Sequence, residues 1–578
     1  MDNVAFNWVV RIFSLAWLTG PIFDKEMRVS SRRRRNYVLR FVYIGLFTFF
    51  VGIMWLGYTV HGTSSVYQIS RMAQAGQGVV MAVLWFQFLT TQAIAIVILS
   101  TSISDEIYKR TLGVLMTTPI GAFQIVIGKL MSKLLQVLLL LLISLPLLAI
   151  VRVFGGVPWN YLACGLCVTL TTVLFVGSLS LFFSIFTRRA YGAIVEAILA
   201  TGLLFGLLPL LVGYLLSRFM SDARFVVGLA YVNPYFMMIV ATESLAAARL
   251  GGLATWPVHC AIMLGASALL LVLAMVFVRK AALRQAVGQV AKRGLEAKDG
   301  KPASIHRVVG PPVLWKERRI PLLGKRKVAT GIVGLVILGL LGVTYVLCVT
   351  EDALGDEQAH VMYTIVYFSV GILLTMIVPA TCITSEKESQ TWSLLLTTTV
   401  GTWEIIAGKA LGVIRRCAPA WGLLFAHVIV FTLGRIIHPL AIVQLAILVT
   451  WVVLFLTGTG LYFSTRFKNT TTAVIANMAL AAVLWAVAPL FLAIAMEIGR
   501  ADSSLVEVYL DMNPFVQAVV VMMGTAGSGG LSPYEWAQGG MRGWAAATEW
   551  MVLTSVVYLA IGLVFVGRAG ARLRRNPF

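Results

Sequence analysis

Long apolar stretches, separated by short polar segments, follow one another along the whole chain. An α-helix needs about 20 apolar residues to cross the hydrocarbon core of a bilayer, and stretches of that length recur in both halves. They predict about twelve membrane helices, six in each half, at residues 39–60, 78–100, 131–151, 161–186, 193–216, 258–278, 328–349, 359–383, 413–433, 440–465, 473–496 and 548–567. We therefore expect an all-α integral membrane protein.

The composition supports this expectation. Hydrophobic residues make up 59% of the chain, charged residues only 12%, and the mean hydropathy is +0.89. A soluble globular domain is far less apolar. The few polar segments therefore carry most of the information on orientation and chemistry.

The formal charge of +22 raises the question of a nucleic-acid partner, and its distribution argues against one. If the N-terminus is cytoplasmic, the outer segments hold only eight of the 46 lysines and arginines, whereas the outer loop 350–358 is acidic. This is the positive-inside pattern of membrane proteins. It predicts a multi-pass protein of a cell inner membrane, with both termini cytoplasmic and Arg32 to Arg35 at anionic lipid.

Residues 6–17 place apolar side chains on one helical face, which suits a helix lying in the inner interface. The same segment lacks the basic leader and the small-residue cleavage site of a signal peptide, so we do not expect one there.

Two motifs that suggest a cofactor fail on inspection. Gly121 and Gly128-Lys129 have the wrong spacing for a phosphate-binding loop, and Leu130 stands where a Ser or Thr should bind magnesium. Cys164 and Cys167 form a CxxC inside a predicted membrane helix, without a second ligand pair. We expect no bound cofactor, no metal and no catalytic residue in this chain.

An internal repeat spans both halves. A shift of 280 residues aligns 111–130 with 391–410 at eight identical positions of twenty, among them Thr111/Thr391 and Lys129/Lys409. The same shift pairs Glu106 with Glu386 and Asn233-Pro234 with Asn513-Pro514. Chance apolar similarity would not keep one register over more than a hundred residues.

Each repeat holds six predicted spans, so both begin on the same side of the membrane and form parallel repeats. The chain is thus expected to be a pseudo-dimer. The domains are a first unit at 1–290, a basic cytoplasmic linker with a second entry helix at 291–327, and a second unit at 328–578.

A cytoplasmic segment between the second and third spans recurs in both units. In the first copy, Leu112, Leu115 and Met116 share one helical face, and Thr118-Pro119 predicts the start of a new helix. Lys129 would extend its ammonium group from this region toward water. A simple interfacial turn needs no particular polar sequence, yet the acids and threonines recur in both copies.

The motifs ISDEIYKRTLGVLMTTP and ITSEKESQTWSLLLTT resemble the ABC-2 type permease pattern, and GPPVLWKERR resembles the entry helix of that family. The resemblance implies the transmembrane subunit of an ATP-driven transporter, coupled to two separate ABC ATPase subunits that hold ATP and magnesium. It assigns ATPase coupling to Glu106, Thr111, Leu115, Thr117, Thr118, Glu386, Glu388, Thr391, Leu395, Thr397 and Thr398, and the entry helices to Lys25, Glu26, Lys316 and Glu317.

The first copy departs further from the family pattern than the second. Tyr108 stands where the second copy has Glu388, and the glycine usual before the threonine is Arg110 or Gln390. The entry segment GPIFDKEMR at 20–28 is also a weaker match. We therefore expect the two docking sites to be unequal.

Other functions remain open at this stage. A secondary transporter can also have six plus six spans, and His427 and Arg415-Arg416 are the ionisable residues that favour it. The predicted spans hold few acids, however: Glu196 lies near an inner end and Glu549 at the outer edge of the last span. A membrane enzyme needs a cluster of acids, His or Cys at one depth, and none is evident. A non-transporting mechanotransmission or scaffold protein is a further alternative. The apolar spans favour export of a lipophilic cargo, but the sequence does not identify the substrate.

Overall fold

The structure is a computed structural model of the chain, and it divides into two compact units, Met1–Ala303 and Ser304–Phe578. The division falls inside the predicted linker, and the predicted domain boundaries at 290 and 327 stay a prediction. The residues that the structure describes are 16–31, 65–108, 111–112, 120–155, 157–187, 190–209, 228–246, 256–286, 310–319, 327–350, 353–489, 503–526 and 543–574, with a few isolated positions between them.

The described part of the first unit is helical. In chain order its helices are α2 (Ala16–Ser31), α4 (Ser65–Ser100), α5 (Ser104–Tyr108), α7 (Ala122–Gly155), α8 (Trp159–Phe186), α9 (Ala190–Gly202) with the π-helical turn η1 (Leu203–Leu207), α12 (Pro234–Ala246) and α13 (Trp256–Ala286).

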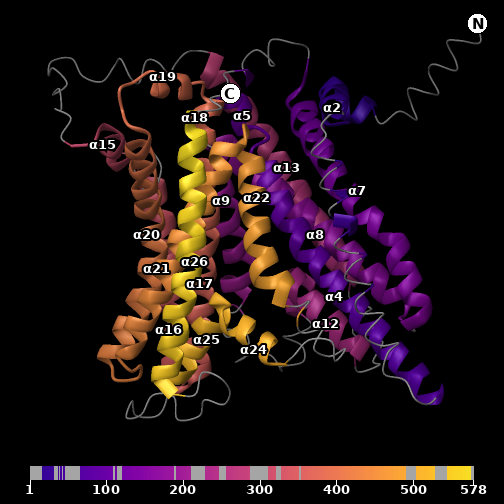
Figure 1. Cartoon of the computed structure of the whole chain (residues 1–578). Helices are drawn as coiled ribbons and strands as arrows, with labels where there is room; N and C mark the ends of the chain where they lie inside the picture. The colour runs from indigo at the N-terminus through magenta and orange to yellow at the C-terminus, as the bar shows by residue number, and fades with distance from the viewer. Residues whose placement is uncertain are drawn as a thin grey trace, which may run out of the picture. The chain divides into compact units, whose positions relative to one another are not determined.

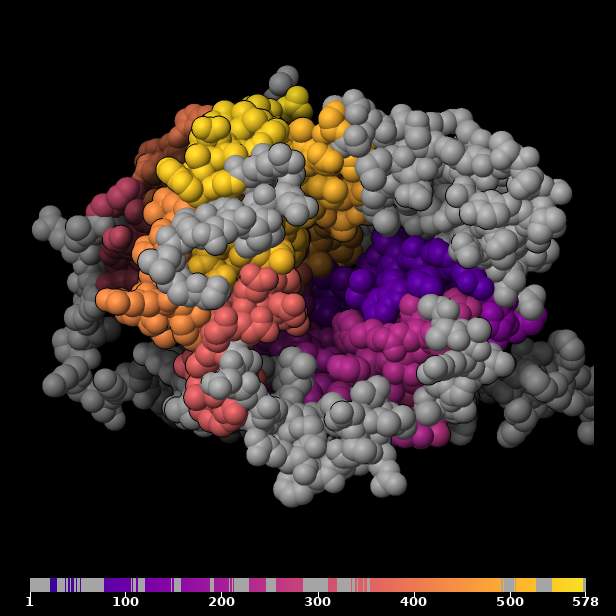
Figure 2. All heavy atoms as spheres, turned by 90° about the horizontal axis from the view of Figure 1, so that it is seen from below, coloured from indigo at the N-terminus to yellow at the C-terminus, as the bar shows by residue number. Residues whose placement is uncertain are grey.

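The described part of the second unit is helical as well, and it includes elements whose first-unit positions lie outside the described residues. Its helices are α15 (Pro312–Arg319), α16 (Lys327–Thr350), the 3₁₀ turn η3 (Ala353–Gly355), α17 (Glu357–Thr381), α18 (Thr384–Glu388), α19 (Trp392–Leu396), α20 (Thr402–Leu433), α21 (Leu440–Arg466), α22 (Thr470–Ala482) with the π-helical turn η4 (Val483–Val487), α24 (Ser503–Asp511), α25 (Pro514–Thr525) and α26 (Gly543–Leu573). Figure 1 shows α15, α18 and α19 at one end of this unit and α24 and α25 at the other. Figure 2 looks onto that second end, where α26 (yellow) reaches the surface.

Nine helices in the described residues are long and apolar enough to cross a membrane, which confirms a multi-pass membrane protein. Four lie in the first unit and five in the second. Of the other predicted spans, 39–60 lies largely outside the described residues, whereas 193–216 and 328–349 contain the shorter apolar helices Gly192–Gly206 and Leu341–Thr350. The expected total of twelve therefore stays a prediction.

The helix that contains the third predicted span begins earlier than predicted in each unit. Spans were predicted at 131–151 and 413–433, but α7 begins at Ala122 and α20 at Thr402. Each helix extends through the polar stretch before the span, since the lysine in that stretch is buried in ion pairs described below. Thr118 and Pro119, the predicted helix start, lie outside the described residues.

Helix boundaries in the two units recur at the same shift of 280 residues. The π-helical turns η1 and η4 follow it, and so do the Asn-Pro motifs. In each unit the asparagine Nδ2 donates to a carbonyl of the π-helical turn, from Asn233 to Phe205 and from Asn513 to Trp485, both at 2.7 Å. A π-helical turn leaves backbone groups without their regular helical partner, and the asparagine satisfies one of them.

Small residues allow close packing inside the second unit. A methyl group at Gly458 of α21 would lie 2.7 Å from the Gly562 carbonyl oxygen of α26, and one at Gly460 would lie 2.7 Å from the ring of Pro379 in α17. Membrane helices commonly use such positions, because the lipid tails provide no hydrophobic drive and backbone proximity has to supply the packing energy. Helix α21 thus lies at the centre of its unit.

Candidate functional site

The predicted coupling segment of the second unit holds the residues from Glu386 to Thr398, and hydrogen bonds to backbone amides fix the chain just before it. After α17 ends at Thr381, the Ser464 hydroxyl at the end of α21 accepts hydrogen bonds from the amides of Ile383 (2.9 Å) and Thr384 (3.0 Å). These amides open α18 and would otherwise lack a helical partner. The short helix is therefore fixed against the end of α21 before its charged residues begin.

Glu386 of α18 lies at the centre of a buried charge cluster. Lys409 of α20 donates to Glu386 Oε1 at 2.5 Å and to Glu317 Oε1 of α15 at 2.7 Å, and Lys316 of α15 donates to Glu386 Oε1 at 3.1 Å. One buried lysine thus joins the predicted entry helix to the predicted coupling segment. Lys409 was not among the predicted site residues, although it is identical in the repeat.

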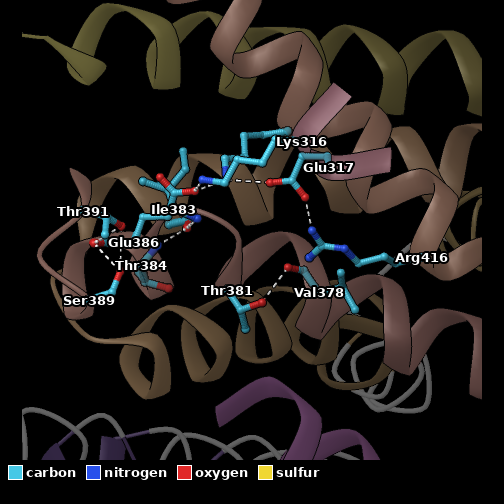
Figure 3. Close-up of polar contacts among 12 residues, drawn as sticks. Lys316, Glu317, Val378, Thr381, Ile383, Thr384, Glu386, Ser389, Thr391 and Arg416 are labelled. Atoms are coloured by element: carbon cyan, nitrogen blue, oxygen red, sulfur yellow. Dashed lines mark hydrogen bonds and ion pairs between the residues drawn. The ribbon is translucent and has the colours of Figure 1, made fainter. Parts of the chain in front are cut away.

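Arginines of α20 complete this arrangement around Glu317. Arg416 forms an ion pair with Glu317 Oε2, and Arg415 donates to the carbonyl oxygens of Glu317 (3.3 Å) and Arg318. Figure 3 shows Glu317 and Arg416 pointing toward each other. From the sequence, Arg415-Arg416 favoured a secondary transporter; in the structure both residues fasten α15 to α20. We call Lys316, Glu317, Glu386, Lys409 and Arg416 the second-unit cluster.

Two glycines of α20 make this cluster possible. A methyl group at Gly412 would lie 2.8 Å from the Cβ of Glu317, and one at Gly408 would lie 2.9 Å from the Val313 side chain and 3.1 Å from the Leu314 amide nitrogen. Larger residues would push α15 away from α20. The glycines therefore set the distance at which Glu317 reaches Lys409.

The electrostatics of the cluster favour its charged form. Burial alone would raise the pKa of Glu386, but the ammonium groups of Lys409 and Lys316 outweigh that effect and hold the pKa below its usual value. Lys409 and Glu317 each expose only 3% of their side chains. Removing one member of a buried ion pair leaves an uncompensated charge, at a cost of roughly 3–5 kcal/mol.

A Schellman motif ends α18 and explains one departure from the family pattern. Gln390 has a φ of 60°. Its amide donates to the Lys387 carbonyl at 3.1 Å, and the Thr391 amide donates to the Glu386 carbonyl at 3.0 Å, which are the two bonds of this motif. Glycine adopts such a φ without strain, and here glutamine occupies the position.

Helix α19 buries one apolar side chain and exposes another. Leu394 is 68% exposed, Leu395 is partly buried, and Trp392 is buried. The exposed hydroxyls of Thr397 and Thr398 donate to carbonyls of their own turn, those of Leu394 (2.9 Å) and Leu395 (2.6 Å). The threonines therefore terminate α19, and Leu394, which was not predicted, is its exposed apolar residue.

The first unit has an equivalent but more open cluster. Lys129 of α7 donates to Glu106 Oε1 and to the Ser102 carbonyl, both at 3.0 Å, and Lys133 donates to Glu26 Oε2 of α2 at 3.2 Å. We call Glu26, Glu106, Lys129 and Lys133 the first-unit cluster.

The structure corrects the prediction for Lys129 in this cluster. Three other predicted residues of the first unit lie outside the described residues. Lys129 is only 4% exposed, so the expectation that it extends into water was wrong. The half-buried ion pair with Glu106 holds Lys129 inside. Thr111 is exposed and contacts Glu106, and Lys25 is exposed. The predicted residues Leu115, Thr117 and Thr118 lie outside the described residues.

A second polar cluster occupies the other end of the second unit. His427 Nδ1 lies 2.7 Å from the Tyr345 hydroxyl, His427 Nε2 lies 3.4 Å from His360 Nδ1, and His360 Nε2 lies 2.9 Å from the Leu354 carbonyl. If both histidines are neutral and the Tyr345 hydroxyl donates to His427 Nδ1, each of these three contacts pairs one donor with one acceptor. Among the described residues no group of three or more His, Cys, Asp or Glu could hold a metal ion.

Comparison with known proteins gives one family. The model of the ABC-2 family transporter proteins matches the chain twice, at residues 21–347 and 278–569. Neither the curated proteins nor the solved structures gave a match. Together the two matches cover nearly the whole chain and include both clusters of acidic residues and lysines. The protein is a member of the ABC-2 family of transporter proteins, and its chain carries the family's membrane unit twice.

Proposed function

We propose that this permease is the transmembrane subunit of an ATP-driven exporter, with two parallel six-helix repeats that together provide twelve spans. Both termini, the 291–327 linker and both coupling segments would lie in the cytoplasm of a cell whose inner membrane holds the protein. Family membership supports the permease role, and the recurrent helix boundaries support the two repeats.

Two separate ABC ATPase subunits would dock on one chain, one at each coupling segment, and would hold ATP and magnesium. The observation that carries this proposal is the second-unit cluster. Lys409 and Arg416 fix α15 and α18 to α20 through buried ion pairs, while the adjoining α19 exposes Leu394. A surface turn would not need buried charges, whereas an element that transmits force from a bound subunit does need rigid attachment to the membrane helices.

The test is the composition of the purified complex. One chain with two ATPase subunits is expected in a mass measurement of the complex extracted from its native membrane. Replacing Leu394 with Asp should release the ATPase at the second unit, whereas Leu433→Asp, at an exposed position of the opposite end of α20, should release neither. Two permease chains for every two ATPase subunits would contradict the fused pseudo-dimer.

A further inference from the structure

Helix α18 carries three consecutive charged residues that reach three different parts of the second unit. Glu386 binds Lys409 of α20, as described above. Lys387 donates to three carbonyl oxygens at the end of α21, those of Ser464 (3.0 Å), Thr465 (2.5 Å) and Phe467 (3.1 Å). Glu388 accepts from the amide (2.6 Å) and the hydroxyl (2.7 Å) of Thr470, the first residue of α22.

The signs of these charges match the helix ends they contact. Carbonyl groups at a helix C-terminus attract a cation, and free amides at a helix N-terminus attract an anion. Asn469, the N-cap residue of α22, makes no side-chain cap of its own, so Glu388 supplies the cap from another helix. We call Lys387 and Glu388 the clasp, because together they hold both sides of the α21–α22 junction.

The first unit has a different chemistry at the same two positions. A shift of 280 places Ile107 opposite Lys387 and Tyr108 opposite Glu388. Ile107 packs against an apolar cluster of its unit. An isoleucine side chain cannot donate to carbonyl groups and a tyrosine carries no carboxylate, so this pair cannot cap the two helix ends with charges.

The rest of α22 is arranged so that a displacement at Thr470 would continue along the helix. Asn477 at its middle donates to the Met376 carbonyl of α17 at 2.7 Å and accepts from the Thr459 hydroxyl of α21 at 2.8 Å. Beyond it lies the π-helical turn η4, held by Asn513. Asn477 thus links the middle of α22 to α17 and α21, between the clasp at Thr470 and the π-helical turn η4.

We propose that Lys387 and Glu388 are positioning residues that transmit the movement of the coupling segment to α22, through charged contacts that Ile107 and Tyr108, at the equivalent positions of the first unit, cannot make. The inference rests on the proposed function, in which an ATPase subunit docks at this segment. It makes the pseudo-dimer mechanically asymmetric: both units can bind an ATPase, but the fifth span of the second unit is tied directly to its coupling segment.

The test uses the purified complex with its ATPase subunits, in a background without native cysteines. Spin labels at Val483 in η4 and Val556 in α26, both exposed positions, report the distance between these elements. We expect the distance distribution to shift when ATP and orthovanadate trap the complex. Lys387→Ala and Glu388→Ala should each reduce this shift by at least half, with the ATPase still bound.

Conservative changes separate positioning from a general loss of structure. Lys387→Arg and Glu388→Asp should keep the shift, and Ile107→Ala in the first unit should leave it unchanged. If the alanine variants do not fold, Lys387→Met and Glu388→Gln, which keep the side-chain length, take their place.

The inference is overturned if the shift persists in the clasp variants, or if it is absent from the unmodified complex although the ATPase is bound. Loss of ATPase from the unmodified chain is a different outcome, because it contradicts the proposed function itself.

Discussion

The first-unit and second-unit clusters use the same three positions with different degrees of burial. In each, a glutamate of the predicted entry helix (Glu26 or Glu317), a glutamate of the predicted coupling segment (Glu106 or Glu386) and a lysine of α7 or α20 lie together. The side chains of Glu317 and Glu386 are 3% and 12% exposed, whereas those of Glu26 and Glu106 are 27% and 25% exposed. Water screens the first set more, so the same charges hold the first unit together less firmly.

The second cation of each cluster also differs. Lys133 reaches Glu26 in the first unit, and Arg416 reaches Glu317 in the second. The shift of 280 places Arg416 opposite Gln136, one helical turn after Lys133. Residues three apart share one helix face, so either position can serve the entry helix. The arrangement of charges is therefore retained although individual cations change position.

The largest expected effect is the loss of the shared lysine. Lys409→Ala should destabilise the second unit by roughly 3–5 kcal/mol, because Glu317 and Glu386 stay buried without their common cation. Lys129→Ala should have a smaller effect, since water reaches its partners. Thermal unfolding of the two purified variants measures the difference. Equal decreases in the melting temperature of the two variants would show that the greater burial of the second-unit cluster does not make it more stabilising.

The next largest effect is expected at Gly412, which sets the distance between α15 and α20. Gly412→Ala places a methyl group against Glu317 and should cost about 1–3 kcal/mol, as overpacking does. Gly422→Ala on the same helix has nothing within 4 Å and is the matched control, expected to be neutral or slightly stabilising. Melting temperatures of both variants decide the point. A harmless Gly412→Ala would mean that α15 does not need its close approach.

A stabilising change is expected at the end of α18. Gln390→Gly should raise the free energy of unfolding by about 1 kcal/mol, because glycine adopts a φ of 60° without the steric penalty of a side chain. Ser389→Gly, at a φ of −80°, has no such strain to relieve and should be slightly destabilising. Thermal unfolding in the same detergent compares the two. A loss of stability in Gln390→Gly would show that the glutamine side chain makes a contribution greater than the strain.

The smallest effect concerns pH. The pKa of Glu386 is lowered in the folded protein, so its ion pairs contribute stability that is present above the pKa of the unfolded chain and is lost as the pH falls through the folded value. As the pH falls below 4.5, the ordinary pKa of a glutamate, the melting temperature should therefore fall more in the unmodified protein than in Glu386→Gln. Parallel curves for the two proteins would mean that Glu386 is not held in its charged form.

The sequence by itself determined the membrane helices, the repeat and the two glutamates of each cluster. A continuous apolar stretch of about 20 residues satisfies its backbone groups in lipid by forming a helix. Glu386 was found because its motif recurs, and Glu317 because its segment resembles the entry helix of the family. The exposed Leu394 and the clasp residue Lys387 were adjacent to predicted residues, but no local pattern distinguishes them from surface side chains.

Only the tertiary structure decided which lysine joins the glutamates. Lys409 lies 92 residues from Glu317 in the chain, and their contact depends on how α15 packs against Gly408 and Gly412. Its identity with Lys129 in the repeat was the available signal, but Lys129 was itself expected to extend toward water. The periodicity of apolar residues shows which face of a helix is apolar. The partner of a buried charge depends instead on how helices distant in the chain pack together, and the spacing of residues along one helix gives no information on that packing.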